Sequence, residues 1–337
     1  MEKLLSTKTD LKFVPDSYIL PSDTRPGTTK VPPLETIPVI DLKQEPTKLI
    51  HQIIDACKDF GFFQLINHGV EEKLIQDVLA VTKEFFELPA EDKAIFFSDD
   101  PKKICRLYTS IDYLKEPVHY WRDALRHLGH PLEKHIQFWP HKPPQYQEVV
   151  GRYSVEVRKL SLYLLDLICT GLGLEPGYFR GETELTEVHV MSANHYPPCP
   201  DPSLTLGLPK HCDVNLITLL LQEMDGLHVM KDGQWLSVEP IPNAIVVNIG
   251  HTLQIISNGK LKSAEHRVVT HQKLARTTVG SFLLPSYSCQ IEPAKVLIKD
   301  SNPPLFKSFT FKDFLATYMT DTYERKPPLE RYKLQVY

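Results

Sequence analysis

Residues 208–222 read LPKHCDVNLITLLLQ, a short polar segment that passes directly into a run of apolar and β-branched residues. On an extended backbone, side chains two positions apart leave the same face, so His211 and Asp213 point together while Cys212 points away. A further histidine, His266, follows 53 residues beyond Asp213. We predict that folding brings His266 to this pair and that the three side chains bind a metal ion.

Two imidazoles and one carboxylate on one side of a cation suit Fe(II) in oxygenases, because this set leaves adjacent coordination positions open for a cosubstrate and dioxygen. Hydrolytic zinc sites use similar ligands. An H-x-D pair also arises by chance as a polar strand end, and His266 taken alone is compatible with an ordinary buried histidine.

The sequence around these ligands predicts a jelly roll. Asp225-Gly226, Asp232-Gly233 and Asn258-Gly259 are dipeptides that accept positive φ in tight turns. Between the turns lie short apolar segments that we interpret as strands, at 188–193, 216–221, 227–230, 235–238, 244–249, 253–256, 267–270 and 277–284. So many short strands in about a hundred residues fit a double-sheet jelly roll, and we expect a mainly β fold with flanking helices.

The rest of the chain divides into three further regions. In residues 1–36, prolines disfavour a continuous helix. In the region that follows, the spacing of apolar residues predicts strands at 37–42 and 62–66. The same spacing predicts helices at 46–60, from about 74 to before Pro89, and at 145–170. A helix at 311–318 could cover one mouth of the barrel. We therefore expect an extended N-terminal leader at 1–36, an α/β region at 37–150, the jelly-roll core at 186–287 and a C-terminal helical cover at 288–337.

Composition narrows the class of partner. The 337 residues include 38 basic and 42 acidic side chains, for a net charge of −4, and 42% are apolar. This balance gives no support to nucleic-acid or membrane binding, so we expect a small-molecule partner. No apolar leader with a small-residue cleavage site opens the chain, and the six cysteines form no C-x-x-C pair. We expect a cytoplasmic protein without disulfides, and a monomer.

A second group of residues favours an anionic cosubstrate. Arg276 lies ten residues beyond His266, and Thr278 shares its strand face. An arginine fork holds a carboxylate with two hydrogen bonds, and a neighbouring hydroxyl adds a third. A dicarboxylate such as 2-oxoglutarate needs this at its far end. Taken alone, Arg276 is also compatible with a surface cation near a turn.

Several longer motifs occur in order along nearly the whole chain: IPVIDL at 37–42, FGFFQLINHG at 60–69, NHYPPCPDP at 194–202, LPKHCDVNLITLLLQ at 208–222, GLHV at 226–229, HRVV at 266–269 and the Arg276-x-Thr278 pair. Together they resemble the plant 2-oxoglutarate/Fe(II)-dependent dioxygenases. The resemblance implies a double-stranded β-helix in which His211, Asp213 and His266 bind iron. It further implies that Arg276 and Thr278 hold 2-oxoglutarate, with Asn194 and Tyr196 facing it.

Within that family, FSDDPKK at 97–103, WRD at 121–123 and YSCQIEPAK at 287–295 most resemble the branch that holds salicylate hydroxylases, flavone synthases and hyoscyamine 6-beta-hydroxylase. Three positions depart from the usual pattern: His195, Cys212 and Thr278. Because His195 alternates away from its neighbours, we expect it behind the site.

The candidate substrate-pocket residues are Phe282, Arg126 and Tyr108. Phe282 shares a strand face with Arg276, which favours a substrate contact. The alternative is that Phe282 is an ordinary core residue. Arg126 could pair with an acidic group of the substrate, with a solvated helix-face arginine as the alternative. Cys199 is expected to be a packed thiol and His68 to be structural.

The resemblance implies an enzyme that uses Fe(II), 2-oxoglutarate and O2, with ascorbate as reductant in vitro. It would hydroxylate or desaturate a small aromatic or alkaloid plant metabolite and release succinate and CO2, and we expect no side chain to act as a catalytic base. Two alternatives remain: a non-catalytic metabolite-binding protein on the same barrel, and a zinc hydrolase.

Overall fold

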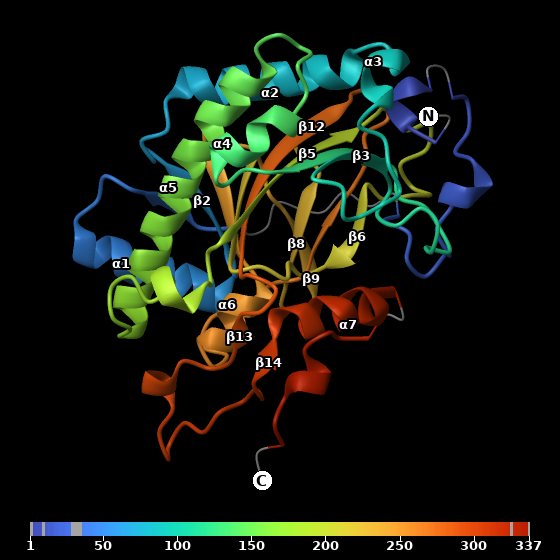
Figure 1. The fold of residues 1–337 in the computed structure, drawn as a ribbon. Helices are drawn as coiled ribbons and strands as arrows, with labels where there is room; N and C mark the ends of the chain where they lie inside the picture. Colours follow the sequence, from blue (N-terminus) through green and yellow to red (C-terminus); the bar gives the residue numbers. More distant parts are fainter. Residues whose placement is uncertain (1–2, 9–10, 28–35, 324–325, 336–337) are drawn as a thin grey trace.

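The computed structural model describes residues 3–8, 11–27, 36–323 and 326–335. Two sheets dominate this part of the chain (Figure 1). The major sheet has the order β1-β2-β10-β7-β12-β5-β4-β3, with β1 at Val39–Asp41, β2 at Phe62–Ile66, β3 at Cys105–Thr109, β4 at Asp123–Leu128, β5 at Val188–Tyr196, β7 at Ile217–Gln222, β10 at Ile245–Ile249 and β12 at Arg276–Leu284. The minor sheet has the order β6-β11-β8-β9, with β6 at Leu208–His211, β8 at Leu227–Lys231, β9 at Gln234–Ser237 and β11 at His266–Val268.

The fold is the jelly roll that the strand pattern predicts, with helices outside it. The helices are α1 at Pro46–Asp59, α2 at Glu72–Glu87, α3 at Ala90–Ala94, α4 at Leu132–His135, α5 at Tyr146–Leu172, α6 at His251–Ile256 and α7 at Phe311–Tyr323. A two-stranded sheet joins β13 at Gln290–Ile291 to β14 at Phe309–Thr310, beside α7 (Figure 1). Short 3-10 turns occupy Leu5–Thr7, Asp16–Tyr18, Ile136–Phe138, Gly181–Thr183, Lys295–Leu297 and Glu330–Tyr332.

The apolar stripes of α1, α2 and α5 bury the outer face of the major sheet and form the larger core with it (Figure 1). The helices α1 and α5 cross closely at Gly171, where a Cβ atom would lie 2.3 Å from Ile54 Cγ1. Gly173 then ends α5 in the left-handed conformation. Because the helices cover the outer face, the inner face of the sheet is left to line the barrel.

The central strand of the inner face is β12. It pairs with β5 on one side and β7 on the other, so that Thr278 lies between Asn194 and Gln222. Side chains of a strand alternate between faces. Arg276, Thr278 and Phe282 therefore share the inner face, while Thr277 points outward.

One of the expected strands was wrong. Residues 253–256, which we expected as a strand, belong to α6. An apolar run of four residues does not distinguish a strand from a helix. Just before this helix, Gly250 packs so close to Asn215 that a Cβ atom would lie 2.0 Å from the Asn215 carbonyl oxygen. The sequence analysis also missed β3, β4 and β6, and it ended the helix that begins at Phe311 too early.

The described part of the predicted N-terminal leader lies over the body of the protein without a long helix. Leu5, Val14 and Tyr18 pack against Trp121 and Cys199 in a separate small core. The rest of that expectation, at residues 1–2, 9–10 and 28–35, falls outside the described residues. Among the helices that the structure describes, none combines the length and the apolar character needed to cross a membrane.

Candidate metal centre

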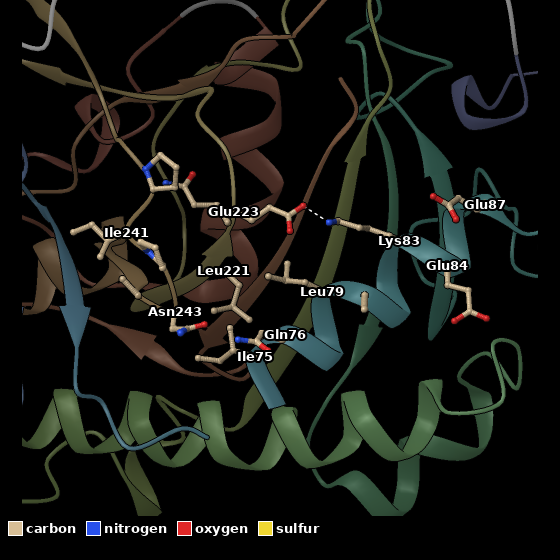
Figure 2. A pocket seen from close by; sticks show the side chains of 15 residues that line it. Ile75, Gln76, Leu79, Lys83, Glu84, Glu87, Leu221, Glu223, Ile241 and Asn243 are labelled. Carbon is tan, nitrogen blue, oxygen red and sulfur yellow. Dashed lines mark ion pairs between the residues drawn. The ribbon is translucent and has the colours of Figure 1, made fainter. Parts of the chain in front are cut away.

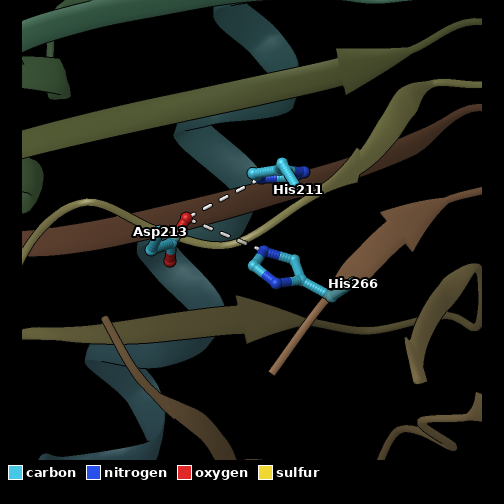
Figure 3. Close-up of side chains that lie close together, drawn as sticks. All are labelled: His211, Asp213 and His266. Atoms are coloured by element: carbon cyan, nitrogen blue, oxygen red, sulfur yellow. Dashed lines mark ion pairs between the residues drawn. The ribbon is translucent and has the colours of Figure 1, made fainter. Parts of the chain in front are cut away.

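The minor sheet brings two of the predicted ligands directly opposite each other. His211 ends β6 and His266 begins β11, and the two residues are cross-strand partners in an antiparallel pair. Their ring centroids are 4.2 Å apart. Asp213, two residues past His211, places Oδ1 3.7 Å from Nε2 of each histidine (Figure 3). The donor atoms of all three residues lie within 4.8 Å of one another, which is close enough to share one cation.

Hydrogen bonds orient each donor atom toward that common point. Nδ1 of His211 lies 2.8 Å from the carbonyl oxygen of Pro209, and Nδ1 of His266 lies 3.2 Å from that of Ala264. A proton on Nδ1 that is donated to a carbonyl leaves Nε2 as the metal-binding atom. The site therefore presents both Nε2 lone pairs inward.

The carboxylate of Asp213 is oriented in the same way. Its Oδ2 accepts hydrogen bonds from Thr218 Oγ1 at 2.5 Å and from Asn248 Nδ2 at 2.8 Å. These donors come from β7 and β10 of the major sheet. The second carboxylate oxygen is thus held, and Oδ1 is left facing the imidazoles.

The charge states match those that a metal requires. Burial, with a contribution from His266, lowers the pKa of His211 to about 4, so this ring is neutral at pH 7. Burial would raise the pKa of Asp213, but the two imidazoles and the hydrogen bonds from Asn248 and Thr218 outweigh it and lower that pKa. A neutral imidazole and an ionised carboxylate are the ligand forms that bind metal ions.

These residues fit Fe(II). Within the described residues they form the one group of three or more His, Cys, Asp or Glu side chains close enough to bind a metal. The three donors approach from one side, from β6, the loop after it and β11 (Figure 3). Such an arrangement leaves the remaining coordination positions open for exogenous ligands.

An anion site lies on the inner face of the neighbouring strand β12. Arg276 is 2% exposed. Its Nη2 donates to Gln222 Oε1 at 2.8 Å and its Nε to the carbonyl oxygen of Met224 at 3.4 Å, whereas the buried Nη1 has no partner. Gly226 makes room for this side chain, since a Cβ atom there would lie 3.2 Å from Arg276 Cδ. A buried guanidinium with an unmet donor suits a carboxylate ligand.

The other predicted 2-oxoglutarate residues adjoin Arg276. Thr278 lies two residues along β12, opposite Asn194 on β5, and Tyr196 is the cross-strand partner of Arg276. The Arg276 Cζ lies 5.4 Å from the Tyr196 ring centroid. The structure thus brings all four residues to one inner-face patch.

Arg122 is a residue of this site that the sequence did not lead us to predict. This side chain is buried, and its Nη1 donates to Asn194 Oδ1 at 3.2 Å. Its Nε and Nη2 donate to the carbonyl oxygen of Ser110, which sits at φ +60°. The signal was present in the WRD motif, but without β4 in the predicted strand set nothing placed Arg122 beside Asn194.

The candidate substrate residues lie on the same inner face. Phe282 is the cross-strand partner of Thr218, the residue that donates to Asp213. Arg126 lies exposed on β4, not on a helix, which corrects the alternative interpretation of it, and Tyr108 lies half-buried on β3.

Two of the residues that depart from the motif pattern, His195 and Cys212, are held by contacts with neighbouring protein groups. His195 points to the outer face, where Nδ1 lies 2.9 Å from Thr277 Oγ1 and the ring stacks on Phe86. Cys212 Sγ donates to Ser263 O at 3.5 Å, and burial raises the pKa of this thiol to about 12. The carbonyl oxygen of Cys212 accepts a hydrogen bond from Tyr318 Oη of α7 at 2.6 Å, so α7 covers the ligand loop.

His68 and Cys199 have the structural roles expected of them. Nε2 of His68 lies 2.8 Å from the carbonyl oxygen of Asn243, and Nδ1 accepts from Val70 N. Cys199 is fully buried. A hollow of about 640 Å³ lies outside the barrel, between α2 and residues 240–244, where Lys83 pairs with Glu223 (Figure 2). It contains none of the predicted site residues.

A jelly roll that carries two histidines and one aspartate beside a buried arginine has the fold and donor set of non-haem iron oxygenases. Comparison with known proteins agrees. The profile of the 2OG-Fe(II) oxygenase superfamily matches residues 187–285, and that of the N-terminal region of non-haem dioxygenases in morphine synthesis matches residues 37–146.

Individual relatives match over almost their full length. Hyoscyamine 6-dioxygenase of Hyoscyamus niger is 44% identical, over 96% of this chain and 97% of its own, and flavanone 3-dioxygenase 2 of rice is 42% identical, over 98% and 97%. The crystal structure of JOX2 in complex with 2OG, Fe and JA superposes with a TM-score of 0.88 at 32% identity, covering 97% of this chain and 96% of that one. The chain therefore belongs to the 2OG-Fe(II) oxygenase superfamily. It is a 2-oxoglutarate- and Fe(II)-dependent dioxygenase.

Proposed function

We propose that this dioxygenase hydroxylates or desaturates a small plant specialised metabolite at a site formed by His211, Asp213 and His266. The observation that carries the proposal is the convergence of these donors within 4.8 Å of one another, beside the unpartnered Nη1 of Arg276. Bound Fe(II) would supply the oxidising chemistry by activating O2 with electrons from 2-oxoglutarate.

The chain's own residues position the reactants. Arg276, with Thr278 beside it, binds the distal carboxylate of 2-oxoglutarate, and this contact fixes how far the other end reaches toward the metal. Arg122 holds the Asn194 amide through Oδ1, so the polar wall of the cosubstrate site stays in one orientation. Phe282 provides an apolar surface near the ligands for the substrate carbon. No side chain of this set has to remove a proton from the substrate.

The metabolite is aromatic or an alkaloid in this proposal. Support comes from two plant relatives, a hyoscyamine 6-dioxygenase and a flavanone 3-dioxygenase. A half-buried aromatic wall at Phe282 and Tyr108 suits a flat ring.

We further propose that the protein acts as a monomer in the cytoplasm. One chain supplies the metal donors and the anion-binding arginine, so no second subunit is needed to complete the site. All six cysteines are free thiols, which suits a reducing compartment.

The test is conversion of 2-oxoglutarate to succinate by the purified protein with Fe(II) and ascorbate, stimulated by phenolic, flavonoid or alkaloid candidates. Product carrying one added oxygen, or lacking two hydrogens, supports the proposal. A metabolite-binding protein would bind candidates and never form succinate above background. A zinc hydrolase would retain its activity without O2 and without 2-oxoglutarate.

A further inference from the structure

The inner face of the major sheet is strongly cationic at its β3–β4 edge. Arg106 on β3 and Arg126 on β4 are cross-strand partners, and Arg122 lies four residues before Arg126 on the same face. The guanidiniums of Arg106 and Arg122 flank the Tyr108 ring, with Cζ 4.3 Å and 5.6 Å from its centroid. We call Arg106, Arg122 and Arg126 the arginine cluster.

No carboxylate projects from the strand faces that carry the cluster, and the carboxylates that act on Arg106, Asp99 and Asp112, lie outside the strands. On the described inner faces of β3, β4, β5 and β12, alternation places no Asp or Glu side chain. Asp123, between Arg122 and Ala124, points the other way and accepts hydrogen bonds from the backbone N–H groups of Leu5 and Ser6. The strand face itself therefore supplies no counter-ion, and the carboxylates near the cluster act on Arg106 from flanking loops.

Two members of the cluster are held and the third is free to bind. Arg106 donates Nε to Ser98 O at 2.7 Å, and Arg122 is held by Ser110 O and Asn194. Arg126 is exposed, and among the described residues no hydrogen bond or ion pair engages its side chain. Burial lowers the pKa of Arg106 and the charge of Arg126 adds to this, whereas Tyr108, Asp99 and Asp112 oppose the shift. An anion between these two arginines would relieve their repulsion.

Small side chains connect this cluster with the metal side of the barrel. Gly280, Ser192 and Arg126 are successive cross-strand partners on β12, β5 and β4. The Phe282 ring lies over Gly280, where a Cβ atom would be 2.8 Å from Phe282 Cε2. Only the small side chain of Ser192 lies between this ring and Arg126 along the paired strands. Two strand spacings separate β12 from β4, or roughly 10 Å.

We propose that the substrate carries a carboxylate, which Arg126 and Arg106 bind at the β3–β4 edge, while the oxidised carbon lies near Phe282. This inference rests on the proposed function and narrows its substrate class to organic acids. The carboxylate is distinct from those of 2-oxoglutarate, because Arg276, which holds the distal carboxylate of 2-oxoglutarate, lies on β12, two strands away from Arg126 on β4.

The experiment measures equilibrium binding by calorimetry to protein loaded with Fe(II) and saturating 2-oxoglutarate, without oxygen and at low ionic strength. The probes are trans-cinnamate and 3-phenylpropanoate, each against its own primary amide, which preserves shape and removes the charge. We expect each acid to bind roughly tenfold or more tightly than its amide, since charge-assisted hydrogen bonds are the stronger ones. Equal binding of acid and amide, or no binding of either acid, would overturn the proposal.

Variants test whether the arginine cluster is the cause of the preference for an acid over its amide. Arg126→Gln should reduce the acid-to-amide ratio about three- to tenfold, and Arg126→Lys should retain most of it, because the charge remains. Because Arg126 is exposed and without a partner among the described residues, neither change should affect folding. Arg152→Gln is the matched control, since Arg152 is an exposed arginine on α5 that pairs with Glu71, and it should leave the ratio unchanged. An unchanged ratio in Arg126→Gln would refute the assignment.

A control on the same samples distinguishes failure of this inference from failure of the proposed function. A 2-oxoglutarate titration is run on each sample before the probes are added. Normal 2-oxoglutarate binding with no preference for acids would contradict only the carboxylate site. Failure of the wild-type protein to bind 2-oxoglutarate in the presence of Fe(II) would contradict the proposed function itself.

Discussion

Replacement of Arg276 by glutamine should weaken 2-oxoglutarate binding by roughly 10²- to 10³-fold. The guanidinium is 2% exposed, and its Nη1 has no partner until a ligand carboxylate arrives. Each hydrogen bond to a charged group contributes about 1.5 to 3 kcal/mol. Loss of a two-point contact, partly offset by the shorter amide, therefore costs about 3 to 4 kcal/mol, and each 1.4 kcal/mol is a factor of ten.

The assay is calorimetric titration of 2-oxoglutarate into Fe(II)-loaded protein without oxygen. Arg276→Lys keeps the charge and loses the fork, so its affinity should fall between those of the wild type and Arg276→Gln. Arg158→Gln is the control, because Arg158 lies on α5, where it donates to the carbonyl oxygen of Thr186.

A thermal measurement excludes a merely structural role for Arg276. An isolated buried charge costs free energy, so Arg276→Gln should unfold at the same or a higher temperature than the wild type when no ligand is present. Added 2-oxoglutarate should stabilise the wild type and leave the variant unchanged. An affinity within twofold of the wild type in a folded Arg276→Gln variant would refute the reasoning.

Further outcomes follow from the same geometry. Asp213→Asn keeps the shape of the side chain and removes its charge, so iron retained after gel filtration, and succinate formation, should fall by about 10²-fold or more; full iron content would contradict the ligand assignment. Phe282→Ala should raise KM for the organic substrate while the Kd for 2-oxoglutarate stays within twofold; a shift in the latter alone would place Phe282 elsewhere. Removal of metal with a chelator should stop turnover, and Fe(II), unlike Zn(II), should restore it. Burial lowers the pKa values of His127 and His189 to about 3. Below the ordinary value of 6.5 the unfolded chain binds protons that the folded chain excludes, so the free energy of unfolding should fall as pH falls from 6.5 toward 3, by about 2 kcal/mol per histidine at pH 5; urea unfolding that is equally stable at pH 5 and pH 7 would contradict this.

The alternation of side chains along a strand correctly predicted which site residues share a strand face. Alternation along the segment 208–213 placed His211 and Asp213 on one face, and alternation along β12 placed Thr278 and Phe282 with Arg276. The jelly roll and most of its central strands were predicted from short apolar runs between turn dipeptides. The approach of His266 was a hypothesis about folding, and its basis is the pairing of β6 with β11.

The sequence analysis failed where pairing partners decide the structure. The segments 105–109 and 123–128 are each interrupted by polar residues, including Arg106 and Arg126, so neither has the apolar run that signals a strand. They form strands because β4 pairs with β5 and β3 pairs with β4. Arg122 was missed for the same reason. The segment 253–256 is apolar enough for a strand or a helix, and it lies in a helix whose first N–H groups, those of His251 and Thr252, donate to the carbonyl oxygens of Asp213 and Asn215.

The pairing of β6 with β11 makes the metal a structural tie as well as a reaction centre. One ion coordinated by His211 and His266 would connect two strands that pair over only a short length. Asp213, which accepts hydrogen bonds from Thr218 and Asn248, would connect the same ion to the major sheet. Iron loading should therefore slow amide exchange at β6 and β11 more than elsewhere. In the cell, iron supply would then govern how long the enzyme survives as well as how fast it works.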